Sequence, residues 1–172
     1  MSTNIIIDDP TTVNDQGPQY TVGGYAWYRH TTYGWWKLRY CQLLNPVTTA
    51  AGQVNYPVAL DGSTLTNDIT GGTSVPWAVI FGGLSLKALT ASYFGWFLVL
   101  GRYPTIATSG ADDIAAGESL ICHGSTDGTA DGVAASATTV ASFGIANTAD
   151  IDAANTVDGN IGPVGGYFIG PN

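Results

Sequence analysis

Charged side chains are scarce in this chain, at 10% of its 172 residues, where about a quarter is usual. Lys, Arg and Trp are absent after Arg102, and the net charge is −8. That charge opposes the phosphates of nucleic acids and of anionic lipids, so we expect neither as a partner. The apolar stretch at residues 75–101 has Lys87 near its middle, so we predict two buried strands there and no membrane span.

Residues that carry catalysis or bind metals are also few. There are two histidines, His30 and His123, and no G-x-S-x-G motif, so a serine triad is not expected. Cys122 and His123 are adjacent, and neighbours on a strand point to opposite faces, so they do not form a dyad. No CxxC or HxxxH spacing occurs. We therefore expect no enzyme activity, no cofactor and no metal.

A calcium site is the one metal alternative that the sequence leaves open. Asp127 and Asp131 lie in a Gly-rich segment, but the spacing does not match an EF-hand loop. Aspartates of this kind are typical of solvated turns, which is the interpretation we favour.

The two cysteines, Cys41 and Cys122, have a spacing that does not require a disulfide. Each is also typical of a small buried hydrophobic residue in a strand, so whether they pair stays open. Residues 1–9 lack the basic start of a signal peptide. We expect synthesis in a reducing cytoplasm.

What the chain does contain is a division at Arg102. All five basic residues and all five tryptophans lie between residues 27 and 102. Eight carboxylates follow: Asp112, Asp113, Glu118, Asp127, Asp131, Asp150, Asp152 and Asp158. One part of the chain is thus aromatic and mildly cationic, and the other is anionic and rich in small residues. This division favours a binding module over an enzyme with a central cleft.

Period-2 alternation predicts strands throughout the chain. Within residues 25–44, Trp36, Leu38 and Tyr40 share one face and Lys37, Arg39 and Cys41 the other. Further strands are predicted at residues 54–60, 75–81 and 93–100, and a helical turn at 84–91. After Arg102, short apolar runs alternate with Asp-Gly turns, which is typical of a sandwich or barrel. We predict an all-β fold, a small β-barrel or sandwich at residues 25–161, with extended segments at 1–24 and 162–172.

Residues 25–40 contain more Trp and Tyr than one small core can bury. Exposed aromatic rings beside Arg and Lys are typical of protein interfaces. Two other interpretations stay open: half of the rings pack the interior, or the rings form a platform for sugars. We predict a partner-contact set comprising Trp27, Arg29, Trp35, Trp36, Lys37, Arg39 and Arg102.

Three segments, in order, carry a family resemblance. Residues 91–101 place an aromatic-Gly-Trp strand before a Gly, residues 110–121 hold a small-residue run with Gly117-Glu118, and residues 143–146 read Phe-Gly-Ile-Ala. Together they resemble the capsid decoration (cement) proteins of tailed bacteriophages over roughly residues 75–161, about half of the chain.

The resemblance implies a β-rich, commonly trimeric protein on the capsid exterior that holds capsomers together, with no catalytic residues. The expected partners are the major capsid protein and further copies of this chain. Residues 29–102 carry five positive and two negative charges, and an acidic shell would attract them. Either terminal segment is expected to be disordered or to cross to a neighbouring molecule. The alternative function is a carbohydrate-binding head-fibre or tip module.

Overall fold

The computed structural model of the chain describes residues 5–7, 9–58, 61–68, 80–110, 113–133, 142–150 and 155–162. Within these ranges every regular element is a strand except one short 3₁₀ turn, η1. The all-β prediction is therefore confirmed. The elements are β1 (Ile5–Ile6), η1 (Pro10–Thr12), β2 (Tyr25–His30), β3 (Gly34–Leu43), β4 (Val54–Pro57), β5 (Thr64–Thr66), β6 (Gly83–Ser85), β7 (Phe94–Ala107), β8 (Ser119–Cys122), β9 (Ala130–Val133), β10 (Gly144–Ala146) and β11 (Thr156–Ile161).

Five strands close a ring in the order β3-β5-β4-β6-β7, because β7 also pairs with β3. The β3–β5 pair is parallel and the other four pairs are antiparallel. A closed ring leaves few unpaired strand edges. β2 extends the ring along the free edge of β3, and β1 adds to β2 in parallel. We call this ring, with β1 and β2, the first lobe.

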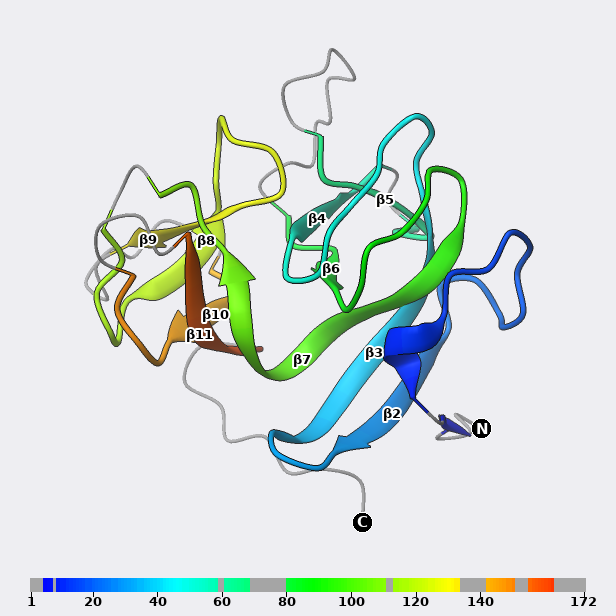
Figure 1. Cartoon of the computed structure of the whole chain (residues 1–172), viewed down its shortest axis with the longest axis horizontal. Helices are drawn as coiled ribbons and strands as arrows, with labels where there is room; N and C mark the ends of the chain where they lie inside the picture. The colour runs from blue at the N-terminus through cyan, green and yellow to red at the C-terminus, as the bar shows by residue number, and fades with distance from the viewer. Residues whose placement is uncertain are drawn as a thin grey trace.

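β7 is the longest strand and belongs to both halves of the molecule (Figure 1). Its residues up to Leu100 pair with β3, and from Gly101 onward it pairs with β11. Gly101 has φ +132°, and a Cβ there would lie 2.9 Å from the carbonyl oxygen of Trp35. Only glycine fits at this point. β11, β10, β8 and β9 follow in that order and, with the end of β7, make the second lobe.

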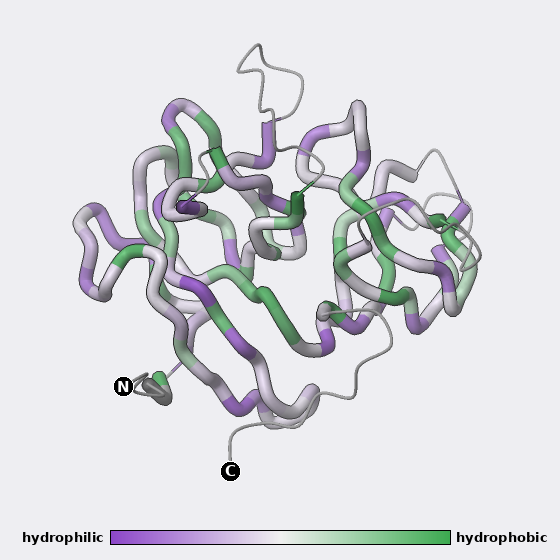
Figure 2. Tube along the Cα trace, turned by 180° about the vertical axis from the view of Figure 1, so that it is seen from behind, coloured by the Kyte–Doolittle hydropathy of each residue, from purple (hydrophilic) through white to green (hydrophobic). Residues whose placement is uncertain are grey.

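One hydrophobic core runs through both lobes. It includes Leu38 and Leu98 from the first lobe and Ile106, Leu120 and Val157 from the second. The opposite face of the β3–β7 pair contributes to a smaller cluster of Cys41, Leu43, Leu65, Leu89 and Phe97. Figure 2 shows hydrophobic (green) positions along much of β7 and polar ones (purple) in many of the peripheral loops.

Several sequence expectations differ from the structure in detail. The predicted strand at 93–100 exists but continues to Ala107, and the predicted helical turn at 84–91 is wrong because β6 occupies Gly83–Ser85. Most of the predicted strand at 75–81 lies outside the described residues, as does all of the 162–172 segment except Gly162.

The described part of the N-terminal segment lies on its own lobe. Asp15 forms an antiparallel bridge with Phe94, and its carboxylate accepts a hydrogen bond from the Tyr40 hydroxyl at 2.6 Å. The ring of Tyr20 packs against Tyr40 and Trp96, with centroids 5.1 Å apart in each pair. We call residues 9–24 the arm. It packs on β3 and β7 of its own molecule, an arrangement that the sequence did not indicate.

Candidate functional site: an aromatic and cationic hairpin face

The β2–β3 hairpin carries a face on which aromatic and cationic side chains alternate. Three cross-strand pairs make it up: Tyr25 with Arg39, Trp27 with Lys37, and Arg29 with Trp35. Each pair sets one ring against one cation, and the order reverses at the third pair. Directly opposed side chains on a sheet are in contact distance. We call these six residues the hairpin face.

Strand parity explains why this face is exposed. The alternate positions of the two strands point the other way. Ala26, Trp36, Leu38 and Tyr40 are each at most 2% exposed, and Tyr28 and His30 are half-buried. A two-residue period then leaves the six remaining positions outside the core. All six are partly or fully exposed, and Tyr25 is 49% exposed. The aromatic and charged parities predicted for β3 are thus confirmed.

Cation–π contacts connect the first two pairs of the hairpin face, Tyr25 with Arg39 and Trp27 with Lys37. The ammonium of Lys37 lies 4.7 Å from the ring centroid of Tyr25 and 5.9 Å from that of Trp27. The guanidinium of Arg39 lies 5.5 Å from the Tyr25 centroid. Contacts of this kind contribute about 0.5–1 kcal/mol at exposed sites. They also fix the long cationic side chains, so less conformational entropy is lost when a partner binds.

Arg39 is anchored at the edge of the face by backbone carbonyls. Its guanidinium donates to the carbonyl oxygens of Asp61 and Gly23. The carboxylate of Asp61 accepts hydrogen bonds from the backbone amide and the hydroxyl of Ser63. These hydrogen bonds lower the pKa of Asp61, and the charge of Arg39 lowers it further by a smaller amount. None of the six face residues is acidic, so the face is cationic on a protein whose net charge is −8.

The structure places two members of the predicted contact set elsewhere. Trp36 is 2% exposed and lies in the core, with its indole N–H donating to the carbonyl of Arg102 at 2.9 Å. Its ring is therefore not available as a contact surface. Arg102 lies on β7 and forms a bidentate ion pair with Asp158 of β11, with N–O distances of 2.6–3.1 Å.

Arg102 thereby links the hairpin tip to the second lobe. Its guanidinium lies 5.6 Å from the ring centroid of Tyr33, and His30 stacks at 4.6 Å on both Tyr33 and Trp36. Burial raises the pKa of Asp158, but hydrogen bonds from Arg102 and Asn147 and the Arg102 charge outweigh it and hold that pKa below its usual value. The ion pair lies within the second lobe, between β7 and β11, and the contact of Arg102 with Tyr33 joins it to the hairpin tip of the first lobe.

Tyr25 belongs to the hairpin face but not to the predicted contact set. It lies two residues before Trp27, and a two-residue period puts the two on the same side. That parity was the signal that could have found it. Five of the seven predicted residues, namely Trp27, Arg29, Trp35, Lys37 and Arg39, come together on this one face.

The histidines and cysteines have structural surroundings. His30 Nδ1 accepts hydrogen bonds from the amides of Thr32 and Tyr33, and His123 Nδ1 accepts from those of Ser125 and Thr126. Both cysteines are free and buried, and burial raises the pKa of each thiol to about 12. Cys122 is therefore a neutral thiol at neutral pH, not an activated nucleophile.

The acidic clusters gather no recognisable metal site within the described ranges. No group of three or more His, Cys, Asp or Glu side chains there could hold an ion. Asp131 uses one carboxylate oxygen to accept from the amide of Gly132 at 2.7 Å, as expected of a turn or strand-end aspartate. Among the same residues no helix is long and apolar enough to cross a membrane.

Comparison with known proteins adds no relative: no family model, no curated protein and no solved structure matches this chain.

Proposed function

We propose that this chain is a structural virion protein that binds the outer surface of a bacteriophage capsid through its hairpin face and cements neighbouring capsomers. The observation that supports the proposal is the set of three aromatic–cation pairs on one exposed face. Aromatic rings and Arg are the residues enriched at the energetic centres of protein interfaces. The resemblance of residues 75–161 to capsid decoration proteins supplies the partner.

Charge explains how such a face would find its target. Arg29, Lys37 and Arg39 present three cations, whereas all charged residues after Arg102 are acidic. An acidic shell attracts the hairpin face and repels the second lobe, so the protein docks in one orientation. Long-range attraction of this kind raises the association rate and weakens as salt is added.

Cementing requires that one molecule, or one oligomer, touches more than one capsomer. We propose a homo-oligomer, with a trimer favoured, because a symmetric assembly presents several hairpin faces at once and so gains effective concentration. Light scattering on the purified protein would establish the number of copies.

The alternative, a sugar platform on the same rings, fits this face less well. Lys37 and Arg39 both lie over the ring of Tyr25, and cations there compete with a sugar for the face of the ring. A flat carbohydrate platform needs open ring faces. The hairpin face is better suited to carboxylates and to apolar protein side chains.

The test is co-sedimentation with capsids that lack the protein, with copies per shell counted at saturation. We expect saturable binding at a stoichiometry that matches the shell symmetry, together with a higher melting temperature of the capsid. The combined variant Arg29→Glu, Lys37→Glu, Arg39→Glu should lose binding while the free protein stays folded, with a melting temperature lowered by the lost contacts of Lys37 and Arg39.

Lys87→Glu is the matched control for charge reversal. Lys87 lies off the hairpin face, where its ammonium donates to the carbonyl of Thr12 at 3.3 Å. It changes the charge by two units, like each single reversal on the face, and should leave capsid occupancy unchanged. Equal losses from face and control reversals would mean that only net charge matters, and unchanged occupancy in the triple variant would refute docking through this face.

A further inference from the structure

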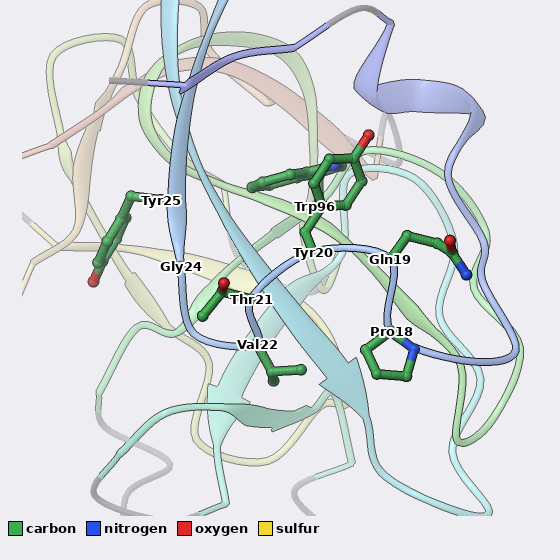
Figure 3. Close-up of a pocket in the computed structure, with 8 residues that line it drawn as sticks. All are labelled: Pro18, Gln19, Tyr20, Thr21, Val22, Gly24, Tyr25 and Trp96. Carbon is green, nitrogen blue, oxygen red and sulfur yellow. The ribbon is translucent and has the colours of Figure 1, made fainter. Parts of the chain in front are cut away.

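A hollow of about 620 Å³ opens between the arm, the start of β2 and Trp96 of β7 (Figure 3). Its walls include Gln19, Tyr20 and Thr21 from the arm, Tyr25 from the start of β2, and Trp96 from β7. A volume of this size falls within the range of small-ligand sites, about 300–1,000 Å³.

The exposed aromatic side chains of the molecule concentrate at this hollow. Within the described residues three large hydrophobic side chains are exposed, and two of them, Tyr20 (40%) and Tyr25 (49%), line it. Other rings nearby are buried, including Tyr40 and Trp96. Leaving part of each tyrosine ring in water forgoes part of the stabilisation that full burial would bring. A ligand that covers them would recover it.

The floor of the hollow holds an unpaired donor. Trp96 is 3% exposed, and its indole N–H has no hydrogen-bond acceptor among the residues that the structure describes. A buried donor without an acceptor costs about 1–3 kcal/mol. Figure 3 shows the Tyr20 ring across the indole of Trp96, and the two centroids are 5.1 Å apart. Displacement of that one arm side chain would open the indole N–H to a ligand.

The polar groups of the hollow are uncharged. All eight lining residues are described, and none of them is Asp, Glu, Lys or Arg. The side chains of Gln19 and Thr21 are exposed and offer an amide and a hydroxyl. Aromatic walls, an amide, a hydroxyl and a free indole N–H match a ligand that has an apolar face, several hydroxyl groups and no charge.

We propose that the hollow binds an uncharged saccharide. The Tyr20 ring moves off the indole and packs on the apolar C–H face of a sugar ring. The sugar hydroxyls hydrogen-bond to Gln19 and Thr21, and one oxygen accepts from the Trp96 indole. The hollow and the hairpin face share Tyr25. The sugar contacts proposed here come from the arm and from Trp96 of β7, so they can be tested separately from capsid docking.

The experiment titrates a panel of neutral oligosaccharides, built from glucose, galactose, mannose or N-acetylglucosamine, into the ¹⁵N-labelled full chain. We expect at least one sugar to shift the Trp96 indole N–H resonance saturably while that of Trp35 stays in place. Tyr20→Ala should raise the dissociation constant of that sugar roughly tenfold. The variant loses an aromatic contact of about 0.5–1.5 kcal/mol and the burial of apolar area on the tyrosine ring.

Two further variants separate the contributions. Trp96→Phe keeps a ring and removes the donor, so it should weaken binding without changing the melting temperature of the free protein greatly. Trp27→Ala lies on the hairpin face outside the hollow, so it should reduce capsid binding and leave sugar binding intact. The failure of either proposal is therefore visible separately.

Three outcomes would overturn the saccharide site. No sugar of the panel shifts the Trp96 indole at its solubility limit, or the sugar that binds does so equally well to Tyr20→Ala, or charged sugars and proline-rich peptides bind the hollow while neutral sugars do not. The last outcome would assign the hollow to a different ligand class.

Discussion

The hydroxyl of Tyr40 is one of the polar groups that fasten the arm to the first lobe, and Tyr40→Phe should loosen the arm selectively. The hydroxyl donates to the carboxylate of Asp15 at 2.6 Å and accepts from the amide of Gln19 at 3.2 Å. The substitution keeps the ring, and with it the contacts to Tyr20 and Trp96. Any effect therefore reports on the two hydrogen bonds.

The magnitude follows from the partners. A hydrogen bond to a charged group contributes about 1.5–3 kcal/mol. Asp15 is only partly buried, so water recovers some of this when the hydroxyl is removed, and we expect a net loss of about 1–2 kcal/mol. For a chain of this length, that lowers the melting temperature by roughly 2–8 °C.

Calorimetry and amide hydrogen exchange measure the two parts of this prediction. Exchange should accelerate at Asp15 and Gln19, whose amides donate to Phe94 and Tyr40, and stay unchanged in β8–β11. Tyr25→Phe is the control, since the Tyr25 hydroxyl makes none of the hydrogen bonds described for this chain. Unchanged melting and unchanged exchange in Tyr40→Phe would refute the account of how the arm is held.

The pH dependence of the same variant gives a second check. Burial, and then the hydrogen bond to Asp15, raise the pKa of Tyr40. The folded state therefore keeps the phenol protonated where the unfolded chain, with a pKa of about 10, has released the proton. The stabilisation is complete below about pH 10 and is lost as the pH rises further. Tyr40→Phe should make the alkaline loss of stability shallower.

Three further predictions concern other contacts. Cys41 and Cys122 should react with iodoacetamide at least about 100-fold more slowly in the folded protein than in urea, because each thiol is buried and its pKa is raised to about 12; fast native alkylation, detected by mass spectrometry, would contradict this. The pKa of Asp158 is lowered, so its stabilisation is present above the unfolded value of about 3.9 and is lost as the pH falls through the folded value. Melting curves of Asp158→Asn should accordingly change less than those of the wild type between about pH 5 and pH 3, and parallel curves would refute this. His30→Ala should speed amide exchange at the two amides that its Nδ1 accepts from, and an unchanged rate would show that the turn holds without it.

The two faces of β3 could be predicted from the sequence because their signal is local, whereas the division of residues 25–44 into two paired strands was not predicted. Trp36, Leu38 and Tyr40 alternate with Lys37 and Arg39, and a two-residue period fixes which side is buried. The same parity places Trp36 in the core, even though its neighbours suggest an exposed cluster. Proximity in sequence to Arg and Lys is a weaker guide than parity, because adjacent strand residues face opposite ways.

The remaining features depend on contacts between distant residues. Closure of the ring requires β3 to pair with both β5 and β7, and no local pattern encodes that. Arg102 marks a change in composition, yet β7 continues through it, because backbone pairing is indifferent to side-chain charge. The partner of Arg102 is 56 positions away, and the arm's contacts with Tyr40 and Phe94 are likewise non-local.

A backbone shared between two lobes also changes how the molecule bears load. No linker joins the lobes, since β7 hydrogen-bonds to β3 in one and to β11 in the other. A force applied to the second lobe is therefore transmitted along the backbone of β7 into the ring of strands. The hydrogen bonds of β7 with β11 and with β3 resist it. A protein that must keep both lobes together while the surface beneath it expands would benefit from a continuous strand that transmits the force. Cutting the chain near Gly101 would remove it even if both fragments stayed associated.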